Sequence, residues 1–388
     1  MADIPKIRFK GFTEPWEQRK LGDVADVTKL AGFEFTEYVV YSDEGNIIAL
    51  RGLNIKNGQL ILDDVKYIDG SNFSKLSRSK LFIDDIMFTY VGTVGEVALI
   101  KENDRFYLAP NVSRIRVKSD DSPKFISHYM RTDNFKNKMI FPLIATSSQP
   151  ALSMENIRKF TINIPINKEE QDRLAKYFDS LDHLITLHQR KCDDTKELKK
   201  YMLQKMFPKN GEKFPEIRFK GFTEAWEQRK FSDVGTVAMC KRIFKDQTSD
   251  EGEVPFYKIG TFGGAPDAYI TRELFEEYKK TYQYPSKGDI LISASGSIGR
   301  TIEYTGEDEY FQDSNIVWLK HGENLDNSFL KVLYSIVEWS CEGSTIKRLY
   351  NDNFLKTEFM LPKIDEQIKI GKYFRKLDHL ITLHRRAL

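Results

Sequence analysis

Short runs of β-branched and aromatic residues, separated by Gly, Asn and Asp, recur through the chain. Runs of this length between turn-forming residues are typical of β-strands. Apolar residues at three- and four-residue spacing after a capping residue instead predict helices, here at 122–130 and 327–337. Each half of the chain is therefore expected to be a mixed α/β (α+β) domain built largely on strands. The predicted strands are 46–50, 59–62, 86–90, 96–100 and 112–117 in the first half, and 288–293 and 314–319 in the second.

The pattern changes between residues 168 and 207, which contain neither Gly nor Pro and are densely charged. Apolar residues here keep a three-four spacing, which predicts one amphipathic helix on the order of 60 Å long. Asn167 followed by Glu170 predicts a capping box at its start, and Pro208 a stop. Residues 365–388 begin in the same way but form a shorter copy.

Two helices of this kind would pack antiparallel as a coiled coil with a domain at each end. A polar residue on the apolar seam, such as His188, can fix the register of such a pair. The alternative is two separate helices, each docked on its own domain. The residues predicted to form the coiled-coil interface are Leu174, Tyr177, Leu181, Leu184, His188, Leu377, Leu380 and His384.

The two halves of the chain repeat each other at three places. Residues 5–20 return almost unchanged as 215–230, the Gly-x-x-Gly of 92–95 returns as 296–299, and 176–188 return as 372–384. Between these anchors the residue identity fades. The chain is expected to be pseudo-twofold, with two domains that share a frame and differ in their inserts. The predicted bounds are 1–167 for the first domain, 168–208 for the spacer helix, 209–363 for the second domain and 364–388 for the short helix.

Composition adds limits to this picture. The 388 residues carry a net charge of only +2, but basic residues gather in clusters such as 75–80 and 114–118, so one face can still be basic. No run is long and apolar enough for a membrane span, and no signal peptide is evident, so we expect a cytoplasmic protein. The three cysteines are far apart and indicate neither a zinc site nor disulfides.

The order of several motifs resembles the specificity subunit of type I restriction-modification enzymes. The motifs are the openers around Trp16 and Trp226, the two Gly-x-x-Gly turns, residues 148–153, and a proline followed by Glu-Gln at the start of each long helix. The resemblance covers nearly the whole chain. It implies two target-recognition domains joined by helices that form an antiparallel coiled coil.

The resemblance also implies a function and partners. Such a subunit reads a bipartite, non-palindromic site with an unread gap in double-stranded DNA. It positions two adenine-methylating modification (methyltransferase) subunits and two restriction (translocase and nuclease) subunits. S-adenosylmethionine, ATP and Mg²⁺ are then expected on those partners, and none on this chain.

The residues expected to touch DNA are basic, amide, hydroxyl and aromatic side chains near the turns and in the inserts. Arg pairs with guanine and Asn or Gln with adenine, while most other surface Lys and Arg contact phosphate. In the first half they are Lys75, Ser77, Arg78, Lys80, Tyr90, Thr93, Arg114, Ser147, Ser148 and Gln149. In the second half they are Lys241, Arg242, Ser295, Ser297, Arg300, Gln312, Lys347, Arg348 and Tyr350.

No catalytic or metal site is expected. The Gly-x-x-Gly pairs lack the remaining residues of a nucleotide-binding loop. Asp267 with Glu277 and Lys279 imitates a nuclease site, but Glu277 falls in a predicted helix where such a site needs a strand. Two alternatives stay open: a self-contained DNA endonuclease or methyltransferase, and a two-headed scaffold that binds no DNA.

Overall fold

The computed structural model describes residues 5–144, 150–209, 211–343 and 347–387. The chain divides into two compact units, Met1–Leu184 (unit 1) and Ile185–Leu388 (unit 2). The division falls inside the long helix α7 (Lys168–Lys205), so each unit takes one part of that helix. It therefore differs from the predicted bounds, which treated the helix as a separate spacer.

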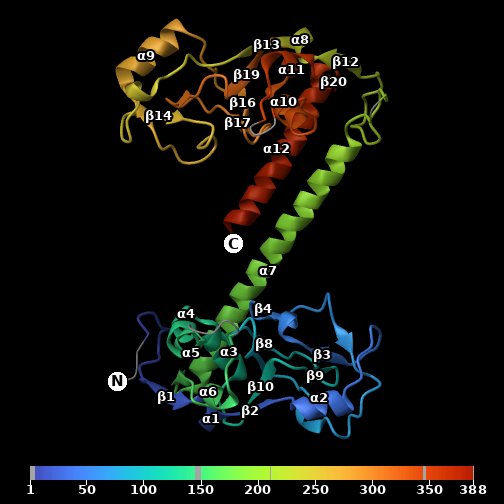
Figure 1. Ribbon diagram of the computed structural model, residues 1–388, viewed down its shortest axis with the longest axis vertical. Coiled ribbons are helices and arrows are strands. Elements are labelled where there is room, and N and C mark those ends of the chain that lie inside the picture. Colours follow the sequence, from blue (N-terminus) through green and yellow to red (C-terminus); the bar gives the residue numbers. More distant parts are fainter. Residues whose placement is uncertain (1–4, 145–149, 210, 344–346, 388) are drawn as a thin grey trace. The chain divides into compact units, whose positions relative to one another are not determined.

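The described part of unit 1 contains a four-stranded sheet, a three-stranded sheet and two pairs of strands, one of which joins the opening segment to the segment before the long helix. Figure 1 shows α2, β3 and β9 at one end of this unit and β1 with α3 to α6 at the other, where α7 begins. The strands are β1 (Trp16–Lys20), β2 (Ala25–Lys29), β3 (Ile48–Leu50), β4 (Ile55–Lys56), β5 (Gln59–Leu60), β6 (Lys66–Tyr67), β7 (Ile86–Thr89), β8 (Val97–Leu99), β9 (Phe106–Leu108), β10 (Val112–Val117) and β11 (Thr161–Pro165). The helices are α1 (Leu21–Val24), α2 (Gly32–Tyr38), α3 (Pro123–Arg131), α4 (Asp133–Phe135), α5 (Phe141–Ile144) and α6 (Met154–Arg158), with short 3₁₀ or π turns at Gly52–Asn54, Ser77–Ser79 and Lys136–Ile140.

Unit 2 repeats this plan. Figure 1 shows α9 and β14 at one end and α10, α11 and β20 at the other, beside α12. The strands are β12 (Glu227–Lys230), β13 (Gly235–Ala238), β14 (Val254–Tyr257), β15 (Tyr269–Ile270), β16 (Ile290–Ser293), β17 (Thr301–Glu303), β18 (Tyr310–Phe311), β19 (Ile316–His321) and β20 (Glu358–Leu361). The helices are α8 (Phe231–Val234), α9 (Arg272–Thr281), α10 (Asn327–Tyr334), α11 (Asn351–Lys356) and α12 (Ile364–Arg386), with a 3₁₀ turn at Lys245–Gln247.

The two units have equivalent sheets. The four-stranded order β2-β10-β7-β8 in unit 1 corresponds to β13-β19-β16-β17 in unit 2, and every pairing in both is antiparallel. The three-stranded order β6-β3-β9 corresponds to β15-β14-β18, each with one parallel pair. Central strands β7 and β16 are buried along their whole length, which explains their continuous β-branched and apolar runs. The predicted mixed α/β fold in two copies is confirmed.

A buried ion pair connects the opening segment of each unit to the start of its long helix. Arg8 Nε and Nη2 donate to the two carboxylate oxygens of Glu170 at 2.5 and 2.6 Å. Arg218 binds Glu366 in the same way at 2.7 and 2.8 Å. The two glutamates are at most 1% exposed. Such bidentate pairs are short, directional and strong.

The glutamine that follows each of these glutamates completes the connection. Gln171 Nε2 donates to Pro165 O at 2.8 Å, and its Oε1 accepts from the Ser122 amide at 2.8 Å. In unit 2, Gln367 binds Pro362 O at 2.8 Å and the Asp326 amide at 2.9 Å. Each Glu-Gln pair thus fastens one helix to the last strand and to the segment that precedes α3 or α10.

These contacts correct the predicted capping box. Asn167 does cap α7, because its Oδ1 accepts from the Glu169 amide at 2.8 Å. The side chain of Glu170 does not take the second part of the box, because its carboxylate is bound to Arg8 instead. A glutamate three residues after the capping residue fits either a capping box or a buried ion pair. The sequence alone therefore does not distinguish the two.

In unit 2 the second part of α7 lies antiparallel to α12. His188 Nδ1 is 3.2 Å from His384 Nδ1, Lys199 Nζ is 2.5 Å from Asp378 Oδ1, and Cys192 Sγ is 3.9 Å from Ile381 O. Residue numbers rise along one helix as they fall along the other, so the directions are opposite. Leu377 of α12 is buried and Leu380 half-buried. In unit 1, Leu174 packs on the domain core, whereas Tyr177, Leu181 and Leu184 are exposed. A full coiled coil that includes those four residues stays a prediction.

We predict that Glu366→Gln lowers the free energy of unfolding by about 3–5 kcal/mol, because it leaves the enclosed Arg218 guanidinium without its carboxylate. Urea unfolding followed by circular dichroism measures the change. The control is Glu155→Gln, which breaks the exposed pair with Lys159 and should cost less than about 1 kcal/mol. Equal, small effects of both substitutions would contradict a structural role for the buried pair.

Candidate nucleic-acid interface

A tight turn follows the central strand of each unit. In unit 1 the turn has two glycines of positive φ, Gly92 and Gly95, where a side chain would be strained. The Thr89 hydroxyl donates to Thr93 O and accepts from the Glu96 amide at 2.9 Å, which closes the turn.

The turn of unit 2 is built in the same way. Ser293 Oγ donates to Ser297 O at 2.5 Å and accepts from the Arg300 amide at 2.9 Å. Gly296 and Gly299 again have positive φ. The two turns have one geometry, but the residue that follows is acidic in unit 1 and basic in unit 2.

A second segment pairs with each turn through backbone hydrogen bonds. The Gly92 amide donates to Pro150 O at 3.1 Å, and the Leu152 amide to Tyr90 O at 2.8 Å. In unit 2 the Gly296 amide donates to Lys347 O at 3.3 Å, and the Leu349 amide to Ala294 O at 2.9 Å. The Pro-Ala-Leu end of the first segment therefore corresponds to Lys347-Arg348-Leu349.

An asparagine that sequence reasoning missed borders each turn. The Asn111 carbonyl accepts from the Tyr90 amide at 3.1 Å, and the Asn315 carbonyl from the Ala294 amide at 2.7 Å. Asn111 has a φ of 72°, a left-handed conformation that Asn tolerates better than most residues. The sequence signal for this residue was an Asn directly before a strand in both halves. It was missed because only this single residue repeats, between stretches that do not match.

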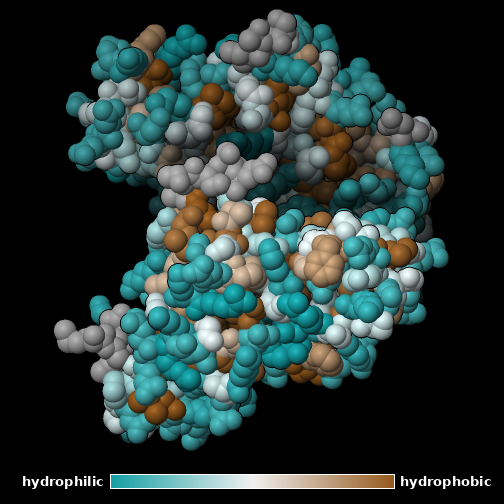
Figure 2. Space-filling model, turned by 60° about the horizontal axis from the view of Figure 1, so that its bottom comes forward, coloured by the Kyte–Doolittle hydropathy of each residue, from teal (hydrophilic) through white to brown (hydrophobic). Residues whose placement is uncertain are grey.

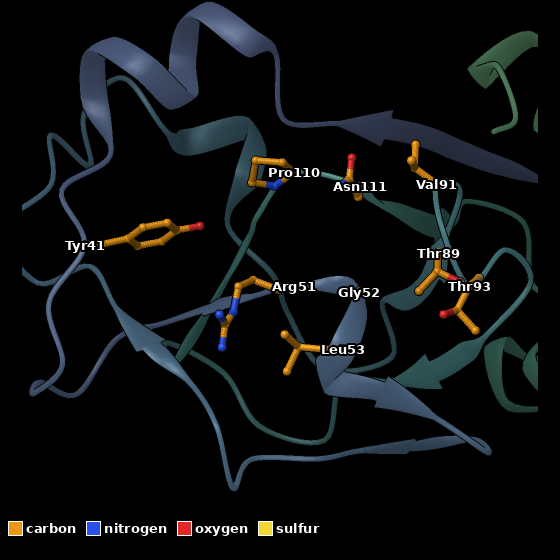
Figure 3. A pocket seen from close by; sticks show the side chains of 9 residues that line it. All are labelled: Tyr41, Arg51, Gly52, Leu53, Thr89, Val91, Thr93, Pro110 and Asn111. Atoms are coloured by element: carbon orange, nitrogen blue, oxygen red, sulfur yellow. Dashed lines mark hydrogen bonds between the residues drawn. The ribbon is translucent and has the colours of Figure 1, made fainter. Parts of the chain in front are cut away.

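In unit 1 these elements border an open cavity of about 390 Å³. Figure 3 shows Tyr41, Arg51, Thr93 and Asn111 around it. Arg51 Nη2 is held by Asp64 Oδ1 at 2.9 Å, while its buried Nε has no hydrogen-bond partner among the described residues. Burial raises the pKa of Tyr41, against the opposing effect of Arg51, so the hydroxyl stays protonated at neutral pH and can donate. The cavity offers donors from Arg51 and Tyr41 and an amide from Asn111.

Unit 2 has a wider cavity of about 660 Å³ beside its own turn. Arg348 and Tyr350 line it, together with Ser314, which has a φ of 52°. Other lining residues include Glu342, Asp352 and Lys356. Ser314 corresponds to Pro110 of the unit 1 cavity, whereas Arg348 and Tyr350 correspond to Ala151 and Ser153, which do not line that cavity. The two cavities therefore lie at different places beside equivalent turns.

The predicted DNA-contacting residues of unit 1 separate into three groups. Thr93 is exposed in the cavity. Lys75, Ser77 and Arg78 are exposed on a different segment, and Lys80 there is paired with Asp104 at 2.6 Å. The third group is enclosed: Tyr90 is 8% and Arg114 6% exposed.

Arg114 is bound to Asp26 Oδ2 at 2.7 Å and to Arg78 O at 3.0 Å, so its guanidinium holds β10 to its neighbours. We remove it from the base-reading candidates for that reason. Ser147, Ser148 and Gln149 lie outside the described residues.

In unit 2, Arg348 and Tyr350 line the cavity, and Ser297 and Lys347 are exposed beside it. Lys241 and Arg242 are exposed, with Arg242 paired to Asp313 at 2.9 Å, and Arg300 binds Phe262 O at 2.8 Å.

Two candidates have structural roles instead. Ser295 is buried and bridges to Arg348 through the backbone. Gln312 Oε1 accepts a hydrogen bond from the Ile259 amide at 2.9 Å. We therefore remove Ser295 and Gln312 from the base-reading set.

The comparison with known families is decisive. The family model for the type I restriction modification DNA specificity domain matches residues 13–196 and again 223–388. The chain belongs to this family. Each of the two units thus carries most of one specificity domain, and the interpretation as a specificity subunit with no catalytic role is confirmed.

Individual relatives agree with the family match. A putative type I restriction enzyme specificity subunit of Haemophilus influenzae is 40% identical over 278 residues, which cover 71% of this chain and 69% of that protein. A putative specificity subunit of Methanocaldococcus jannaschii is 23% identical over 99% of this chain and 92% of its own length. The crystal structure of a specificity subunit from M. genitalium has a TM-score of 0.63 at 14% identity and covers 100% of this chain and 94% of that one, which shows a shared fold.

Two of the three residues in the nuclease-like set form ion pairs with residues outside it. Asp267 is paired with Lys258 at 2.9 Å, Glu277 lies on α9, and Lys279 binds Asp308 at 3.2 Å. Within the described ranges, no group of three or more His, Cys, Asp or Glu could hold a metal ion. No helix among those ranges is both long and apolar enough to span a membrane.

Proposed function

We propose that this specificity subunit reads a bipartite, non-palindromic DNA site with an unread gap, one part with each unit. The observation that carries this proposal is the equal backbone of the two turn sites combined with their unequal side chains. Equal frames present both sites in the same way, and unequal side chains select different base pairs. Thr93, Asn111 and Arg51 would act in unit 1, and Ser297, Arg348 and Tyr350 in unit 2.

The chemistry of these groups suits base edges in the major groove. An Asn amide can both donate to and accept from adenine, and an Arg guanidinium can bind guanine with two hydrogen bonds. Lys75, Arg78, Lys241 and Lys347 are exposed cations and would bind phosphates, which gives affinity without sequence preference. The near-neutral net charge does not argue against this division, because base reading depends on local groups.

The same frame would present two equivalent surfaces to two modification subunits, which methylate adenine, and to two restriction subunits. S-adenosylmethionine, ATP and Mg²⁺ would be bound by those subunits. This chain would supply sequence recognition and spacing. A long helix without Gly or Pro is a suitable spacer because it resists bending.

The motif methylated in a host that carries this gene with its modification partner tests the proposal. Single-molecule methylation sequencing, compared with the same host without the gene, should give two short unlike sequences around a gap. The half-sites should lie about one helical turn apart, roughly 34–36 Å. A continuous or palindromic motif would contradict the proposal.

We predict that Asn111→Gly relaxes specificity at one base pair of one half-site, by about 1–3 kcal/mol. Glycine keeps the left-handed backbone at this position and removes only the amide side chain. Competition binding of the complex to single-base variants of the site measures the effect. Asn57→Gly is the matched control, because Asn57 also has a positive φ but does not line the cavity. Equal losses on every sequence would assign Asn111 to phosphate contact.

We predict that four helical residues inserted after Leu184 change the permitted gap, because they lengthen the spacer by about 6 Å. Methylation sequencing of the variant should show a longer gap between unchanged half-sites. As a control, four residues inserted at Gly306, in an exposed turn of unit 2, should leave the gap unchanged. An unaltered gap with the helix insertion would mean that α7 does not set the spacing.

A further inference from the structure

The segment beside the turn of unit 2 pairs with a further stretch of chain. The Glu342 amide donates to Arg348 O at 2.9 Å, and the Arg348 amide donates to Glu342 O at 2.8 Å. On its other side Arg348 forms an antiparallel bridge with Ser295. The three residues therefore lie in one row across antiparallel segments, and their side chains leave the same face of that row.

The outer members of this row are open to the cavity of unit 2. Ser295 is buried, whereas Glu342 and Arg348 are exposed and line the cavity. Directly opposite residues of an antiparallel pair have Cβ atoms about 4.5–5.5 Å apart. An acidic and a basic side chain thus lie next to each other at the place where unit 2 is proposed to meet DNA.

These two charges are not used up by contacts within the chain. Glu342 Oε1 accepts a hydrogen bond from Asn353 Nδ2 at 2.8 Å. Among the described residues, no ion pair joins Glu342 to Arg348, and the Arg348 guanidinium has no hydrogen-bond partner. The surface visible in Figure 2 is largely hydrophilic, so an exposed charge alone does not mark a recognition residue. The distinguishing feature here is an acceptor and a donor on neighbouring positions.

The two groups suit the two bases of one base pair. In the major groove guanine presents the acceptors N7 and O6, which an Arg guanidinium binds with two hydrogen bonds. The cytosine paired with it presents the N4 amino group, whose hydrogen a Glu carboxylate accepts. A carboxylate is unfavourable beside phosphates and beside the O4 acceptor of thymine, so it also selects against the wrong base.

The equivalent position of unit 1 has different chemistry. Ala151 corresponds to Arg348, because it forms the equivalent bridge with Val91. Its methyl group cannot donate hydrogen bonds to guanine. The pair of charges therefore distinguishes the two units at a point where their backbones agree.

We propose that Glu342 and Arg348 together read a single C·G base pair in the half-site of unit 2. Arg348 binds the guanine, and Glu342 accepts from the amino group of the cytosine. This inference rests on the proposed function and goes beyond it by naming the base pair and by adding an acidic residue to the specificity-determining set. Asn353 is a positioning residue, because its amide holds one carboxylate oxygen and leaves the other for the base.

The test uses the complex of this chain with its modification subunit, and duplexes of its site that each contain one base analogue. In these analogues 7-deazaguanine lacks the N7 acceptor, and 2-pyrimidinone lacks the amino group of cytosine. We expect each analogue to weaken binding about 5- to 100-fold at one position of one half-site. The two sensitive positions should be the partners of one base pair.

Three substitutions assign these contacts to side chains. Arg348→Ala should remove the effect of 7-deazaguanine, and Glu342→Ala the effect of 2-pyrimidinone. Glu342→Gln keeps the size of the side chain and should shift preference at this pair toward A·T by at least about five-fold, because a Gln amide pairs with adenine. Glu338→Ala is the control and should keep both analogue effects, because Glu338 is exposed but does not line the cavity.

Two results would overturn this inference and leave bipartite recognition intact. One is a Glu342→Ala complex that remains as sensitive to 2-pyrimidinone as the unaltered complex. The other is sensitivity to the two analogues at different base pairs. Equal binding of the unaltered complex to its site and to random duplexes would instead contradict the proposed function, and this inference with it.

Discussion

Each unit depends on a buried, bidentate ion pair between an arginine of its opening segment and a glutamate in the first turn of its long helix. A charge removed from water is costly unless it is paired and its hydrogen-bonding capacity is used. Arg8 and Arg218 meet this condition with their glutamates, and the glutamines next to these bind the last strand and the segment before α3 or α10. The ion pair thus fixes the point at which the long helix leaves the domain. The same segments enclose the sheet that carries the turn sites.

The repeated motifs are repeated because they make these structural contacts. Arg, Trp, Glu and Gln recur where a directional or buried contact tolerates no substitute, whereas the cavity residues make few contacts that the fold requires. Glu96 and Arg300 illustrate the difference: both follow a closed turn of the same geometry, yet their charges are opposite. A surface that the fold does not constrain is free to vary with the DNA sequence it reads.

The elements with a clear period were predicted well. The long helix was expected at 168–207 and lies at Lys168–Lys205, and β7 and β10 fall within their predicted runs. Both Gly-x-x-Gly pairs were expected in tight turns, and all four glycines have positive φ.

What sequence reasoning missed depends on contacts between distant residues. Tyr41 and Arg51 reach the cavity from loops with no period. The structural role of Arg114 is set by Asp26 on a neighbouring strand. Glu170 was assigned to a capping box because its partner Arg8 lies far away in the sequence.

An internal repeat also limits what residue identity can predict. Phe178 and Phe374 occupy the same position in the same motif, and a pattern of apolar residues predicts burial for both. Only one is buried, because α7 continues past its own domain and ends in the core of unit 2. Burial is therefore a property of the whole set of neighbours, and a near-perfect repeat in sequence does not give the two copies equal burial.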